Sequence, residues 1–97
     1  MSLYRRDAKR DANEPVIRKA VHDVGAVTWQ LREPCDLLVL YEGVFRTFEV
    51  KDGDKPPSAR QLTPAEREYA EVCRYHHGPH FVVTSITEAL QALGVIR

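Results

Sequence analysis

The spacing of apolar residues changes several times along this chain, and each change predicts a new secondary-structure element. Ile17, Val21 and Val24 recur at the three- or four-residue spacing of an amphipathic helix. Gly25 then stands where glycine commonly ends a helix. The order of the expected elements, αβββαβα, predicts an α/β fold. The expected helices cover residues 13–24, 64–76 and 85–93, and the expected strands cover residues 26–31, 36–41, 44–51 and 80–83.

The second and third expected strands are joined by a tight turn. Only residues 42–43 separate them, and a two-residue gap with glycine second is typical of a β-hairpin. If Tyr41 and Val44 flank the turn, counting back along both strands places Asp36 opposite Glu49. Directly opposed side chains have Cβ atoms roughly 4.5–5.5 Å apart, where two like charges repel each other. A divalent cation bound by both carboxylates would remove this repulsion.

Lys51 is expected on the same face as Glu49, because strand side chains alternate with period two. Two acids and an ammonium group then meet at one end of the hairpin. A simpler interpretation stays open, in which Lys51 only forms a cross-strand salt bridge with one of the acids. Against it, the carboxylate face also carries Leu38, Leu40 and Phe45. Because both faces are apolar, we expect a sheet covered by helices on each side, where unpaired charges are costly.

An Asp at a strand start, then a hairpin, then Glu-x-Lys resembles the core of the PD-(D/E)XK nuclease superfamily. The stretches 36–39, 49–53 and 62–64 follow one another as in small phage-type VRR-NUC and Holliday-junction-resolvase-like nucleases, which this chain resembles. The resemblance implies a restriction-endonuclease-like αβββαβα core, in which a mixed central sheet carries helices on both faces. It also implies Mg²⁺-dependent hydrolysis of DNA phosphodiester bonds in phage DNA processing or recombination, with Mn²⁺ as a substitute for Mg²⁺.

Carried over to this chain, the resemblance assigns catalysis to Asp36, Glu49 and Lys51. It implies that the metal is held by the two carboxylates and the carbonyl of Val50. The chain departs from the family pattern next to Asp36. The family usually has Pro directly before this Asp, whereas this chain has Cys35 there. The additional residue is expected to shift the ligand only slightly, since Asp36 still satisfies the hairpin register.

Two further acids have both a functional and a structural interpretation. Glu14, at the start of the first helix, resembles an auxiliary metal-site glutamate of the family, but an i,i+4 ion pair with Arg18 explains it as well. Glu66 follows Thr63 by three residues, with Pro between them at the first helical position, and this spacing is that of a capping box. We therefore expect Glu66 to cap the helix and leave it out of the site.

The charge balance bears on DNA as a partner. The chain has 14 Lys or Arg and 14 Asp or Glu, whereas nucleic-acid-binding domains are usually basic. The basic residues are concentrated in the first twenty positions, although a solvated charged tail is an alternative explanation of that run. The expected DNA contacts are Arg5, Arg6, Lys9 and Arg10 in this region, and Lys55 and Arg60 in the loop after the third strand.

The length of 97 residues suits one domain. We expect residues 1–12 to form a polar, flexible N-terminal segment and residues 13–97 a single nuclease-like domain. The sequence contains no run of about 18 apolar residues, so it predicts no membrane span. We expect a cytoplasmic protein of a phage or bacterium. A homodimer suits a small domain that covers little DNA. The alternative function is a catalytically silent DNA-binding or protein-interaction module with the nuclease fold.

Overall fold

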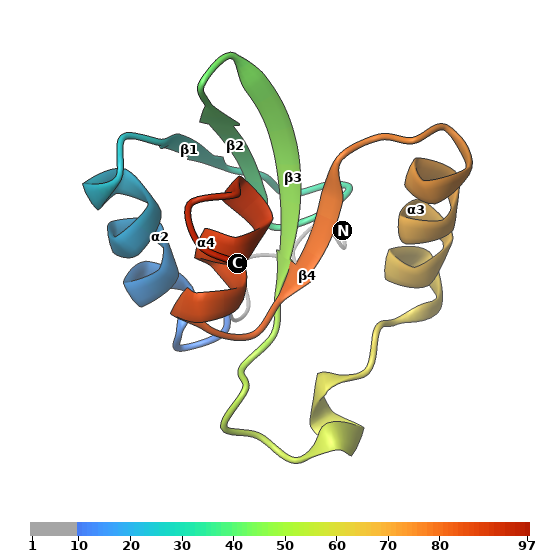
Figure 1. Ribbon diagram of the computed structural model, residues 1–97. Helices are drawn as coiled ribbons and strands as arrows, with labels where there is room; N and C mark the ends of the chain where they lie inside the picture. The colour runs from blue at the N-terminus through green and yellow to red at the C-terminus, as the bar shows by residue number, and fades with distance from the viewer. Residues whose placement is uncertain (1–9) are drawn as a thin grey trace.

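The computed structural model describes residues 10–97 (Figure 1). The elements appear in the expected order αβββαβα, with one short 3-10 helix added between the third strand and the second helix. They are α2 (Glu14–Asp23), β1 (Val27–Gln30), β2 (Leu37–Tyr41), β3 (Val44–Val50), η1 (Pro57–Arg60), α3 (Pro64–Tyr75), β4 (His80–Val83) and α4 (Ile86–Leu93). None of the helices in this part of the chain has the length and apolar character needed to cross a membrane.

The four strands form one mixed sheet in the order β1-β2-β3-β4. The first three strands are antiparallel neighbours, and β4 runs parallel to β3 after the crossover through α3. The hairpin register pairs Leu37 with Phe48, as counting from the turn predicted. Glu42 and Gly43 both have positive φ, 49° and 80°, which a two-residue turn of type I′ requires.

The core lies between one face of the sheet and the helices α2 and α4, which cover that face in Figure 1. Its apolar side chains occupy alternate positions of β2 and β3, because every second residue of a strand points to the same face. Phe48 is fully buried, and its ring meets that of Phe81 edge-on with centroids 6.2 Å apart. The other core residues are Ile17, Val21, Ala26, Leu37, Val39, Val50, Val83, Ala89 and Leu93.

Helix α3 packs on the opposite face, near β3 and β4. The Tyr69 hydroxyl lies 3.1 Å from Thr47 Oγ1, and the Tyr69 ring meets the ring of His80 at 4.7 Å. Helices thus lie on both faces, as expected. The expectation that this second face is buried throughout is wrong, because Phe45 on β3 is 54% exposed and Trp29 on β1 is 46% exposed. The reason is that α3 packs against β4 and the middle of β3, where Tyr69 meets Thr47, whereas Trp29 lies on β1 and Phe45 lies at the turn end of β3.

The helices begin and end at residues with suitable capping chemistry. Thr63 Oγ1 accepts a hydrogen bond from the Glu66 backbone N–H, and Glu66 Oε1 accepts one from the Thr63 N–H at 2.8 Å. This reciprocal pair confirms the predicted capping box of α3. Ser85 caps α4 through the Glu88 N–H. Gly25 follows the end of α2 with φ of 105°, a conformation that favours glycine.

Candidate active site

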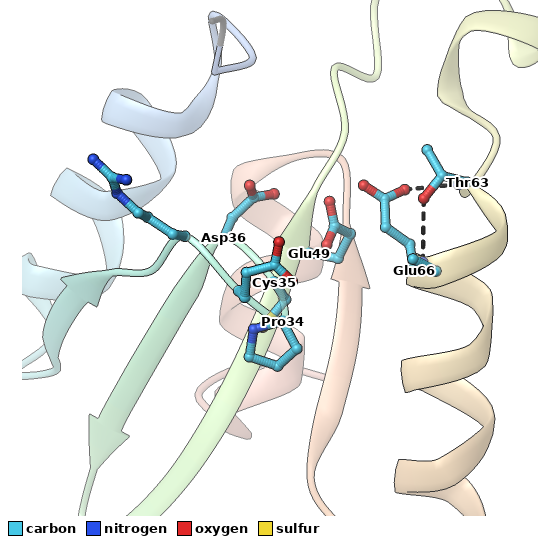
Figure 2. Close-up of a pocket in the computed structure, with 9 residues that line it drawn as sticks. Pro34, Cys35, Asp36, Glu49, Thr63 and Glu66 are labelled. Carbon is cyan, nitrogen blue, oxygen red and sulfur yellow. Dashed lines mark hydrogen bonds between the residues drawn. The ribbon is translucent and has the colours of Figure 1, made fainter. Parts of the chain in front are cut away.

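A cavity of about 490 Å³ lies where β2 begins and β3 ends, between the loop before β2 and the start of α3. Figure 2 shows Asp36, directly before β2, and Glu49, on β3, pointing into it, while Glu66 faces them from α3. The three carboxylates point to the same side, with Glu49 between the other two. The remaining lining residues are Arg32, Glu33, Pro34, Cys35, Thr63 and Ala65.

Asp36 stands directly before β2 and is held against β3. Its backbone N–H donates to the Phe48 carbonyl at 3.2 Å, and its Oδ2 accepts a hydrogen bond from the Val50 N–H at 2.8 Å. The N–H and C=O groups of one strand residue point to the same neighbour, so the Val50 carbonyl is directed to the side of Asp36. The structure therefore brings the predicted ligands Asp36, Glu49 and Val50 together at one end of the hairpin.

Glu49 is only 4% exposed. Its burial and the nearby carboxylates of Asp36 and Glu66 raise the pKa of Glu49 from 4.5 to about 9. The Lys51 ammonium, with Nζ 3.9 Å from Glu49 Oε2, lies too far away for a hydrogen bond. At neutral pH Glu49 therefore carries a proton, which a bound cation would displace.

Lys51 follows β3 directly, and its closest acidic partner is on α3. Its Nζ lies 2.9 Å from Glu66 Oε1. Burial acts to lower the pKa of Lys51, but the hydrogen bond and the charge of Glu66 outweigh it and raise this pKa. The ammonium is therefore charged at neutral pH. The alternative of a salt bridge within the hairpin holds in part, because Lys51 Nζ is also within ion-pair distance of Glu49 Oε2, but the shorter contact joins the sheet to a helix.

Glu14 is buried at the start of α2, with 1% of its surface exposed. Its carboxylate accepts hydrogen bonds from Arg10 Nη1 at 3.1 and 3.2 Å and from Gln30 Nε2 at 2.9 Å. Arg18 instead donates from Nε to Thr28 Oγ1. The alternative of an ion pair between Glu14 and Arg18 is therefore wrong, because Arg18 turns toward β1 while the guanidinium four residues before Glu14 takes its place.

Arg10 joins Glu14 to the loop before β2. Its Nη1 lies 3.7 Å from Asp36 Oδ1, and its Nη2 donates to the Leu31 carbonyl at 2.7 Å. Glu14 thus reaches the cavity acids through a guanidinium, and its contacts are those of an internal ion pair. The Arg10 guanidinium is directed inward, whereas the predicted DNA contact requires it to face a phosphate.

The other residues predicted to contact DNA lie in two places. Arg5, Arg6 and Lys9 fall outside the described residues. Lys55 is half exposed, and its Nζ lies 3.3 Å from Asp11 Oδ1. Arg60, in η1, donates from Nε to the Lys55 carbonyl at 2.7 Å. Both belong to the connection between β3 and α3, so they follow the strand that carries Glu49, and their role toward DNA stays a prediction.

Glu66 and Cys35 are among the lining residues that were not predicted as part of the site. Glu66 was assigned to the cap alone, and its position two residues after the stretch 62–64 was the available signal for a second role. Cys35 lies in the loop before Asp36, and its burial raises the pKa of the thiol to about 12. Cys35 Sγ lies 3.9 Å from the Leu37 carbonyl. It is a neutral thiol that shapes the wall of the cavity.

The donors at the cavity suit a hard cation. Within residues 10–97 no three or more His, Cys, Asp or Glu side chains form a ready-made metal site. The available donors are the carboxylates of Asp36 and Glu49 and the carbonyl of Val50, all of them oxygens. Mg²⁺ commonly binds one or two carboxylates and keeps several waters and a substrate phosphate as its other ligands. This donor set therefore fits Mg²⁺ with water and substrate completing the coordination.

No protein-family model matches this sequence, and no curated protein is significantly similar to it. The structure is similar to a solved structure described as "VRR_NUC domain", with a TM-score of 0.60 and 22% sequence identity. The match covers 90% of this chain and 100% of the other chain. VRR-NUC domains belong to the PD-(D/E)XK nuclease superfamily. Residues 10–97 therefore have the α/β fold of a VRR_NUC domain, with a mixed four-stranded sheet and three α-helices, in the order of elements that the sequence predicted.

Proposed function

We propose that this domain is a metal-dependent deoxyribonuclease that hydrolyses DNA phosphodiester bonds. The observation that carries the proposal is the convergence of Asp36 and Glu49 in one cavity, with the Lys51 ammonium beside them. The likeness in fold supports a nuclease, and this group of side chains supports a particular chemistry. Processing or recombination of phage DNA is the setting that the sequence resemblance implies.

Asp36, Glu49 and the Val50 carbonyl would hold Mg²⁺, with Mn²⁺ as a substitute. When bound, such an ion polarises a phosphate and lowers the pKa of an attacking water. Asp36 uses Oδ2 to accept from the Val50 N–H, which leaves Oδ1 for ligation. Glu49 would lose its proton on binding, so that its carboxylate faces the cation in the charged form.

Lys51 would act on the phosphate through its positive charge. Because its pKa is raised, the ammonium is a poor base for removing a proton from water. A fixed cation beside the scissile phosphate instead stabilises the negative charge that develops during hydrolysis, and its N–H groups can orient the attacking water. The side chain is 14% exposed, so little bulk water screens this charge.

A homodimer is part of the proposal, and the exposed apolar face of β1 and β3 supports it. Trp29 and Phe45 have ring centroids 6.4 Å apart, and both rings are about half exposed. Val27 lies on the same face and is also exposed. Such a contiguous apolar surface marks an interaction site more often than an isolated residue does. Two-fold pairing of this face between copies would bury both rings.

The test of the nuclease proposal uses end-labelled duplex, single-stranded, flapped and four-way DNA with Mg²⁺, Mn²⁺ or EDTA. We expect cleavage of at least one substrate with either metal and none with EDTA. Glu49→Ala and Lys51→Ala should abolish this cleavage. Lys19→Met is the matched control, because Lys19 is exposed on α2 and pairs only with Asp23 among the described residues.

The outcomes separate the proposed function from its alternative. DNA binding without cleavage under every metal would support a silent DNA-binding module that retains the nuclease fold. Unchanged cleavage by the Glu49→Ala variant would reject the cavity as the active site.

A further inference from the structure

One carboxylate oxygen of Glu66, Oε1, accepts two hydrogen bonds from different parts of the fold. Its Oε1 accepts a hydrogen bond from the Thr63 backbone N–H at 2.8 Å, which completes the cap of α3. The same Oε1 accepts a hydrogen bond from Lys51 Nζ at 2.9 Å. The Glu66 side chain therefore connects the start of a helix to the residue that follows β3.

The contact with Glu66 decides where the Lys51 ammonium lies. Lys51 has a long side chain with many rotamers, and ordering such a chain has an entropic cost. Glu49 is 3.9 Å from Nζ, beyond hydrogen-bonding distance, so among the described residues Glu66 is the side chain that holds it by a hydrogen bond. The Glu66 carboxylate is itself held by the backbone of Thr63, and it lines the cavity.

The protonation states suit this contact. Burial acts to raise the pKa of Glu66, but the Thr63 backbone N–H and the Lys51 ammonium outweigh it, so that the pKa of Glu66 is lowered. Both partners are therefore charged at neutral pH, and a charge-assisted hydrogen bond between them is stronger than a neutral one.

We propose that Glu66 is a positioning residue, which holds the Lys51 ammonium beside Glu49 at the cavity. For its kinetic consequence this inference rests on the proposed nuclease function. A capping role alone would affect the stability of α3. A positioning role predicts in addition that turnover and the order of the Lys51 side chain depend on Glu66.

Three variants separate the two roles. Glu66→Ala removes the cap and the contact with Lys51 together. Glu66→Gln keeps a carbonyl oxygen that can accept from both the Thr63 N–H and Lys51 Nζ. Glu88→Ala is the matched control, because Glu88 closes the start of α4 by accepting from the Thr84 N–H at 2.7 Å and is not among the residues that line the cavity.

The first measurement needs neither metal nor DNA. In a ¹⁵N NMR spectrum of the metal-free protein, the Lys51 ammonium should give a resonance whose protons exchange slowly with water, assigned by its loss in Lys51→Ala. We expect this resonance to disappear in Glu66→Ala and to persist in Glu66→Gln and Glu88→Ala.

The second measurement is steady-state DNA cleavage. We expect Glu66→Ala to lower kcat roughly 10- to 100-fold, since a displaced catalytic group has effects of this size, with KM within about twofold of wild type. Glu66→Gln should restore most of kcat, and Glu88→Ala should match wild type.

A Lys51 resonance that persists in Glu66→Ala would overturn the inference, and so would a wild-type kcat in that variant. An equal loss of kcat in Glu88→Ala would also overturn it, because loss of a helix cap would then explain the effect. If wild type cleaves no DNA, the proposed function fails, while the NMR comparison still decides whether Glu66 positions Lys51.

Discussion

Asp36 accepts a hydrogen bond from the backbone N–H of Val50, with 2.8 Å between Oδ2 and the nitrogen. This bond ties the loop before β2 to the end of β3, one residue beyond Glu49. One oxygen of Asp36 is thereby engaged by the backbone, while Oδ1 lies 3.7 Å from the Arg10 guanidinium. The Asp36 carboxylate is consequently held in place against the backbone of β3.

The Asp36 carboxylate accepts the hydrogen bond from the Val50 N–H and is proposed to bind the metal ion, and substitutions can separate these two roles. Asp36→Asn keeps an oxygen that can accept from the Val50 N–H but removes the charge, so we expect a stable protein whose Mn²⁺ affinity falls at least roughly tenfold. Asp36→Ala should in addition lose about 1 kcal/mol of stability with the hydrogen bond. Mn²⁺ titration followed by EPR and urea unfolding measure the two effects. Equal Mn²⁺ affinity in Asp36→Asn and wild type would place the ion elsewhere.

The pKa of Glu49 predicts how the stability of the metal-free protein depends on pH. Its folded pKa of about 9 lies above its ordinary value of 4.5, so between these values the folded state keeps a proton that the unfolded state has released. This stabilisation is complete below pH 4.5 and is lost as the pH rises toward 9, by about 1 kcal/mol per pH unit.

Urea unfolding of wild type and Glu49→Gln across this pH range tests the prediction. Glutamine does not titrate, so the stability of the variant should change less with pH and should exceed that of wild type at the alkaline end. Parallel pH profiles of the two proteins would show that Glu49 does not hold the proton. Glu88→Gln, an exposed substitution on α4, controls for the loss of one carboxylate.

Loss of the Arg10 guanidinium should destabilise the fold. Arg10→Met leaves the buried carboxylate of Glu14 without its cation, and removal of one partner from a buried ion pair costs about 3 kcal/mol. Lys19→Met removes an exposed pair with Asp23 that has the same i,i+4 spacing, and should cost about 0.5 kcal/mol or less. Chemical unfolding of both variants gives the comparison. Similar losses would mean that the Arg10 pair contributes no more than a surface pair.

The basic N-terminal residues are predicted to bind DNA phosphates. An Arg5→Ala/Arg6→Ala double variant should weaken DNA binding and lower the salt dependence of the affinity by roughly 0.9 per lost duplex contact. Turnover of bound substrate should stay nearly constant. Titration of labelled DNA at several salt concentrations measures both slopes, with Lys19→Ala as a control for lost charge. Identical slopes in the double variant and wild type would identify these residues as a solvated tail.

The exposed apolar face of β1 and β3 predicts the oligomeric state. Wild type should sediment as a dimer, and a Trp29→Ala/Phe45→Ala double variant should sediment as a monomer, because the apolar area available for pairing is reduced. Tyr75→Ala is the matched control, since this aromatic residue is 80% exposed and lies on α3, outside the exposed face of β1 and β3. A monomeric wild-type protein in analytical ultracentrifugation would contradict the homodimer.

Local sequence patterns were enough to predict the secondary-structure elements and the proximity of Asp36 and Glu49. The turn at 42–43 has two residues, and so short a turn leaves one register for the hairpin that it joins. From that register the meeting of Asp36 with Glu49 followed without further information. The cap at Thr63 and Glu66 was likewise predictable, since both hydrogen bonds lie within one helical turn.

Packing between distant segments decided the rest. The contact between Lys51 and Glu66 depends on how α3 crosses the sheet, and the contacts of Arg10 depend on how the chain before α2 meets the loop before β2. The exposure of Phe45 also depends on packing between distant segments, because an apolar strand face has the same sequence pattern whether or not a helix covers it. Sequence spacing determines which face of an element a residue occupies, whereas its partner depends on which other element packs against that face.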